Sequence, residues 1–210
     1  MKTDDLIRSL AADQGWHEAP VAQALWRALL VALPVSAIIF FAELGLRPDF
    51  TQALRSFFFD LKFVVTGTLV AAAFVFALEL TRPEAPAARR WLLLAPLVIL
   101  IAGIGIDLAI QTSPMRVRMM GTNALICLSS IPLLSLPFLV AAFMALRRGA
   151  STRPVLSGAV AGLLAGGLGA TLYAAHCFDD SPLFVATWYS MAIAVVVIVG
   201  ALAGRRWLRF

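Results

Sequence analysis

Charged residues are scarce in this 210-residue chain. Only 14% of the residues are Asp, Glu, Lys or Arg, whereas 61% are hydrophobic. A soluble domain of this length would not carry so little charge. The chain has instead six apolar stretches of about 20 residues, the length that a helix needs to cross a hydrocarbon core of about 30 Å. These stretches are 28–46, 63–80, 91–110, 124–146, 155–175 and 183–203.

The six apolar stretches must be helical, because no water inside a bilayer satisfies the backbone N–H and C=O groups. The expected fold class is therefore all-α: a polytopic membrane protein with six transmembrane helices. Short loops predict an up-down bundle in which consecutive helices are neighbours. We expect an N-terminal segment over 1–25, a membrane domain over 26–204 and a C-terminal tail over 205–210. The polar first 24 residues do not resemble a cleavable signal peptide.

Lysine and arginine are unevenly distributed between the two sides. The side that holds both termini has 12 of the 17 basic residues. The positive-inside rule therefore predicts that both termini are cytoplasmic. Because the basic residues cluster at helix ends, their expected contacts are membrane lipid headgroups, and no direct nucleic-acid binding is expected. The other five basic residues are Arg47, Arg55, Lys62, Arg116 and Arg118.

Cysteine is almost absent, and neither of the two cysteines lies in a CxxC motif. Without a CxxC motif, the sequence gives little support for a metal site built from closely spaced cysteines. The predicted topology places Cys127 and Cys177 at the same outer boundary, on adjacent helices. They can form a disulfide if their Cα atoms come within about 7 Å, or share a soft metal ion. They can also be no more than small apolar residues.

Polar residues flank the second cysteine. His176 precedes Cys177, where it can lower the pKa of the thiol or join a metal site, or else be a solvated loop histidine. Asp179 and Asp180 follow. Elsewhere, the carboxylates within apolar stretches are expected to pair with an outer arginine. These carboxylates are Glu43 and Asp107, and the arginines are Arg47, Arg116 and Arg118.

Two further patterns concern helix surfaces. Gly158, Gly162 and Gly166 recur every fourth residue, which lets a second helix approach closely. We expect this close packing within one chain, with a homodimer as the alternative. Near the N-terminus, Leu6, Ile7 and Leu10 share one face of a short predicted helix, and such a face can dock into a partner's groove.

The chain resembles the NrsF family of proteobacterial multi-pass membrane anti-sigma factors. The resemblance rests on KTDDLIRSLA near the N-terminus, CLSSIPLLSLP around Cys127 and AHCFDDSPLFVATWY around Cys177. It implies a protein of the bacterial inner membrane whose N-terminal part holds an extracytoplasmic-function sigma factor. It also implies that Cys127 and Cys177 take part in sensing heavy-metal or oxidative stress.

The sequence therefore predicts a regulator, with no enzyme activity and no cofactor. Alternatives are a membrane thiol oxidoreductase and a small membrane scaffold. An oxidoreductase usually needs a CxxC pair and more than two cysteines for a relay. A transporter would need charged groups near the middle of the membrane, where these stretches offer only glycines and hydroxyls, among them Thr66, Ser135 and Thr171.

Overall fold

The structure is a computed structural model that describes residues 21–81, 88–149 and 153–208. Within these ranges it is helical and contains no strand. Six of its helical segments are long and apolar enough to cross a membrane, as the sequence predicts. They contain α2 (Val21–Glu43), α4 (Phe57–Glu79), α5 (Leu94–Ile110, after the turn η1, Ala88–Leu93), α7 (Ala124–Leu146), α8 (Pro154–Ala174) and α10 (Ser190–Trp207, after the π-helical turn η2, Val185–Tyr189). Three short helices lie in the connections: α3 (Phe50–Ala53), α6 (Met115–Met120) and α9 (Pro182–Phe184).

The sequence places α7 and α8 to within a residue, but α2 and α4 begin earlier than predicted. Helix α2 starts at Val21, so it includes the last residues of the segment assigned to 1–25. Its first turns bury Ala24 and Leu25 in the core, which explains the longer helix. Helix α4 starts at Phe57 and takes up Lys62, which apolar length alone assigns to a loop.

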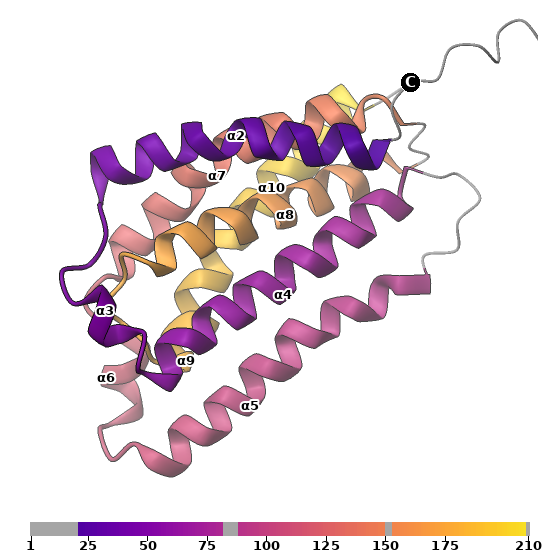
Figure 1. Ribbon diagram of the computed structural model, residues 1–210. Helices are drawn as coiled ribbons and strands as arrows, with labels where there is room; N and C mark the ends of the chain where they lie inside the picture. Colours follow the sequence, from indigo (N-terminus) through magenta and orange to yellow (C-terminus); the bar gives the residue numbers. More distant parts are fainter. Residues whose placement is uncertain (1–20, 82–87, 150–152, 209–210) are drawn as a thin grey trace, which may run out of the picture.

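Helix α8 lies at the centre of the bundle, in contact with α4, α7 and α10 (Figure 1). Its glycine face packs within the chain, as expected. A Cβ added at Gly158 would meet the backbone of Gly200, and one added at Gly162 would meet the backbone of Val196. The small residues thus let α8 and α10 approach at backbone distance.

The expectation that consecutive helices are neighbours holds only in part. Helix α2 packs mainly against α7, far along the chain, and meets α4 only weakly, through an edge-to-face contact of Trp26 with Phe74 whose ring centroids are 6.1 Å apart. Helix α5 is peripheral and packs chiefly on α4, as Figure 1 shows. Short connections therefore do not decide the helix neighbours here, because the glycines of α8 bring its backbone against α7 and α10 instead.

The bundle has two distinct ends. The loop end comprises 44–56, 111–123 and 175–181, where α3, α6 and α9 gather in Figure 1. The basic end comprises the start of α2 and the ends of α4, α7 and α10. There Phe143 of α7 and Trp207 of α10 stack edge to face, with ring centroids 6.2 Å apart.

Candidate functional site

The two cysteines come together at the loop end. Cys127 is in the first turn of α7, and Cys177 follows α8 directly. Both side chains are fully buried, and both thiols are free. They belong to one apolar cluster, which also contains Tyr173, Phe184 and Tyr189. Because α7 and α8 pack against each other, the structure encloses both thiols in a single interior region, here called the thiol cluster.

Two tyrosines line the thiol cluster, which the sequence analysis did not anticipate. The Tyr173 and Tyr189 rings lie 5.7 Å apart between centroids. The Tyr173 hydroxyl donates to the Asn123 carbonyl at 3.4 Å. The Tyr189 hydroxyl is buried and has no hydrogen-bond partner among the described residues. An unpartnered buried hydroxyl is costly, which makes this side of Cys177 a polar spot within an apolar cluster.

Burial controls the chemistry of Cys177. It raises the pKa of this thiol, more than the positive charge of Lys62 and the hydrogen bond to the Asp179 backbone lower it. The thiol donates a weak hydrogen bond to the Asp179 carbonyl, with 3.8 Å between sulfur and oxygen. A thiol with a raised pKa is protonated at neutral pH and reacts slowly. Any reaction of Cys177 therefore needs the loop end to open, or a reagent that enters it.

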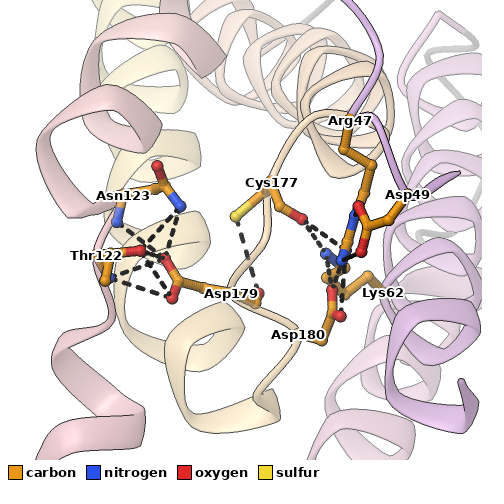
Figure 2. Close-up of polar contacts among 8 residues, drawn as sticks. All are labelled: Arg47, Asp49, Lys62, Thr122, Asn123, Cys177, Asp179 and Asp180. Atoms are coloured by element: carbon orange, nitrogen blue, oxygen red, sulfur yellow. Dashed lines mark hydrogen bonds and ion pairs between the residues drawn. The ribbon is translucent and has the colours of Figure 1, made fainter. Parts of the chain in front are cut away.

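An ion-pair cluster covers the thiol cluster on one side. It consists of Arg47, Asp49, Lys62 and Asp180, and Figure 2 shows it beside Cys177. The Asp180 carboxylate lies 2.6 Å from Lys62 Nζ and 3.1 Å from Arg47 Nη1. Lys62 is only 1% exposed and Arg47 only 7%. Two buried cations in an apolar bundle are tolerable only with such partners.

Both buried cations also hold the main chain of Cys177. Lys62 Nζ donates to the Cys177 carbonyl at 2.9 Å, and Arg47 Nη1 donates to the same oxygen at 3.3 Å. The ring of Phe59 lies beneath both cations, 5.0 Å from Lys62 Nζ and 5.3 Å from the Arg47 guanidinium carbon. This cation–π contact offsets part of their lost hydration. The backbone of 175–181 is thus fixed where it passes the thiols.

Arg47 also forms a paired contact with Asp49, in which Nε and Nη2 each donate to one carboxylate oxygen at 2.8 Å. This contact lowers the pKa of the Asp49 carboxyl and, with Asp180, raises the pKa of Arg47. Two parallel charge-assisted bonds fix the guanidinium plane. Because the same guanidinium also pairs with Asp180, the loop after α2 is joined to the loop after α8.

Asp179 ties the other side of the same loop to α7. Its carboxylate accepts from the backbone N–H groups of Thr122, at 3.0 Å, and Asn123, at 2.9 Å, and from Asn123 Nδ2 at 3.1 Å. These residues immediately precede α7, where a negative charge is favourable. Figure 2 shows Cys177 between this anchor and the ion-pair cluster. The loop is held on both sides of the thiol.

The remaining predicted residues have different outcomes. His176 Nδ1 lies 3.0 Å from the Gly45 carbonyl, so the ring joins two loops. Asp107 pairs with Arg118, as expected. Glu43 is exposed, and no ion pair between described residues involves it; the acidic partners of Arg47 are Asp49 and Asp180.

Metal binding by Cys127 and Cys177 stays a prediction. In the described ranges no three His, Cys, Asp or Glu side chains are grouped as a metal site would need. Leu6, Ile7 and Leu10 lie outside the described residues. The buried cations were not predicted from the sequence, although a lysine within FFFDLKFVV was a signal: apolar residues on both sides place Lys62 inside a helix.

The fold and the site define a class of protein: an all-helical protein with six helices of membrane-spanning length, which encloses a pair of free thiols under a loop fixed by charges. The family model described as negative regulator of sigma F, NrsF, matches residues 10–210, and the chain belongs to this family.

Two relatives align over the full length of both chains. The anti-sigma-F factor NrsF of Caulobacter vibrioides is 35% identical, and the probable anti-sigma-F factor NrsF of Azospira oryzae is 33% identical. The family description is that of a regulator, in line with the expected class. No solved structure matches the chain.

Proposed function

We propose that this chain is an inner-membrane anti-sigma factor. It holds an extracytoplasmic-function sigma factor through the face formed by Leu6, Ile7 and Leu10, and it releases that factor when Cys127 and Cys177 react with a heavy metal or an oxidant. Both termini are cytoplasmic and the helices form an up-down bundle, so the loop end faces outward. This orientation follows from the distribution of basic residues.

The observation that carries this proposal is the burial of two free thiols in one cluster, at the end of the bundle opposite the start of α2. A sensor of external stress needs a reactive group on the outer side and a docking element on the inner side. The enclosed thiols suit a sensor that stays silent until challenged. They do not suit an oxidoreductase, whose pair must meet its substrate repeatedly.

The trigger is a change at the two sulfurs. Either a thiophilic cation binds both thiolates and displaces their two protons, or an oxidant accepts two electrons and two protons as the thiols form a disulfide. Each change draws α7 towards the loop after α8. Helix α2 packs on α7, so movement of α7 reaches the helix that follows the N-terminal segment. For the thiols and the docking face to be coupled, both must favour one of the same two positions of α7.

The test uses two kinds of variant in the full-length protein. The Leu6→Ala/Leu10→Ala variant removes the docking face, and each buried leucine contributes about ten- to a hundredfold in affinity. The sigma factor should no longer co-purify with this variant. Cells that carry the variant should express the sigma factor's regulon without inducer. Cys127→Ser and Cys177→Ser should keep the sigma factor bound but fail to release it with Cd²⁺ or an oxidant.

Two results would count against this function. If the leucine variant co-purifies the sigma factor as well as the unaltered protein does, the docking surface lies elsewhere. If both cysteine variants release the sigma factor normally, the thiols are not the sensor. Membrane levels of each variant, measured by immunoblot, separate these outcomes from failed insertion.

A further inference from the structure

Helices α2 and α7 enclose a groove of about 710 Å³ that the proposed function does not use. Its base is formed by small side chains, which leave space between the two helices. They are Ala24, Ala28 and Ala32 on α2 and Ala141 and Ala145 on α7. The groove is open along one side, on the outer surface of the six-helix bundle. In a membrane this opening faces lipid.

The groove has a closed end. Near the middle of α2 the two helices meet, where the buried Ser36 hydroxyl donates to the Leu134 carbonyl at 3.1 Å. From Ala24 to Val35 the lining follows α2 for about 16 Å, at a rise of about 1.5 Å per residue. That length is about half of a hydrocarbon core of about 30 Å. The groove is therefore about as long as one leaflet is thick.

Two arginines line the groove at the basic end. Arg27 projects from α2 and Arg148 lies just after α7, and both are exposed. No ion pair that joins two described residues involves either of them. Trp26, which is 58% exposed, lies beside Arg27 and is the kind of residue that marks the membrane–water interface. Two guanidinium groups from opposite walls are suited to a phosphate, which they can bind through paired hydrogen bonds.

A second groove lacks charged residues, and this difference distinguishes the α2–α7 groove from it. It lies among α4, α5, α8 and α10, has a volume of about 410 Å³, and includes Thr66 and Ser190 in an otherwise apolar lining without any charged residue. Any apolar groove on the membrane face accommodates acyl chains. Of these two grooves between described helices, the α2–α7 groove alone adds positive charge at the depth of the headgroups.

We propose that the α2–α7 groove binds one anionic phospholipid. Its acyl chain fills the groove up to the Ser36–Leu134 contact, and its phosphate lies between Arg27 and Arg148. The site does not depend on which end of the bundle faces the cytoplasm, because both leaflets offer this chemistry. A lipid at this position contacts α2 just after the N-terminal segment and α7 on the helix that carries Cys127.

The test uses the full-length protein in nanodiscs made of equal parts phosphatidylcholine and phosphatidylglycerol. Phosphatidylglycerol with a photoreactive group in its acyl chain is cross-linked, and the labelled peptides are mapped by mass spectrometry. Label should appear on α2 and α7. It should fall about fivefold in Arg27→Gln and about thirtyfold in Arg27→Gln/Arg148→Gln, given the usual contribution of a basic residue at a membrane surface.

Arg147→Gln is the matched control, because Arg147 is exposed beside Arg148 but does not line the groove. It should change the label little. Labelling of the second groove by photoreactive phosphatidylcholine reports whether each variant is folded.

The proposal is overturned if phosphatidylcholine labels the α2–α7 groove as strongly as phosphatidylglycerol. It is also overturned if Arg147→Gln has the same effect as Arg27→Gln. Label that appears only after deletion of residues 1–20 would assign the groove to that segment. A cross-link between two chains there would assign it to a second copy.

Discussion

The two ends of the bundle use the same residue types in opposite ways. At the loop end, Lys62 and Arg47 are buried and committed to Asp180. At the basic end, the Arg89 side chain is 66% exposed. Its Nε lies 3.7 Å from Glu79 Oε1, which is a long distance for an ion pair. Counting basic residues treats both ends alike, although a buried cation that is paired with a carboxylate is not available to a lipid headgroup. A charge near a helix end is therefore informative only when its burial is known.

The largest effect should come from breaking the buried pair. Lys62→Met leaves Asp180 with Arg47 alone and removes the donor to the Cys177 carbonyl. Removal of one partner of a buried ion pair typically lowers the free energy of unfolding by about 3–5 kcal/mol. Arg89→Gln, the matched change at the basic end, should lower it by less than about 1 kcal/mol. Denaturant unfolding in mixed micelles measures both, and equal effects would erase the difference between the ends.

Backbone packing, rather than ion pairing, should stabilise the half of the bundle nearer the basic end. Gly158→Ala places a Cβ against the backbone of Gly200 and Gly204. Overpacking of this kind lowers the free energy of unfolding by about 1–3 kcal/mol. Gly105→Ala is the control, because a Cβ there meets nothing within 4 Å, and it should be nearly neutral. If the two variants unfold alike in the same micelles, α8 and α10 do not approach as closely as described.

A smaller effect is expected at the anchor between 175–181 and α7. Asp179→Asn removes the charge that accepts from the Thr122 and Asn123 backbones. Loss of such a contact lowers the free energy of unfolding by about 1–2 kcal/mol. Asp49→Asn is the comparison, because the Asp49 side chain is 42% exposed, and its effect should be smaller than that of Asp179→Asn. A larger effect of Asp49→Asn would show that Arg47, not Asp179, fixes the loop.

The smallest expected effect is a change in pH dependence. Burial raises the pKa of Cys177, so the folded protein holds this proton more tightly than the unfolded chain. The resulting stabilisation is complete below the unfolded thiol pKa of about 8.5 and is lost as pH rises through the folded value. In Cys127→Ser, the rate at which a membrane-permeant bimane alkylates Cys177 should increase with pH. This increase should occur at a higher pH than the increase for free cysteine. Coincident profiles would mean that the thiol is not buried.

Apolar length alone predicted the six helices, because a bilayer leaves no other backbone structure. Counting apolar residues failed at the starts of α2 and α4, where Arg27 and Lys62 lie inside helices. Their long side chains can extend from a helix to water or to a partner. A charge near the end of an apolar stretch is therefore weak evidence for a loop.

Topology also predicted that Cys127 and Cys177 lie at one end, because two connected helices return to the same side. It could not predict the enclosure of the thiols. Nor could it predict the ion pair beside Cys177, because Lys62 and Asp180 are far apart in the sequence and meet only when α4 packs beside the loop after α8. The orphan hydroxyl of Tyr189 arises in the same way, from contacts between helices that a linear pattern does not contain.

The most direct test is the rate at which a membrane-impermeant maleimide labels each cysteine in intact spheroplasts. If the ion-pair cluster seals one thiol cluster on the outer face, Cys127 and Cys177 should label slowly and at similar rates. Lys62→Met should accelerate both at least tenfold, and Arg89→Gln should accelerate neither; a tenfold change corresponds to about 1.4 kcal/mol in the opening equilibrium. Labelling that requires lysis, or rates that Lys62→Met leaves unchanged, would contradict this structure–function assignment.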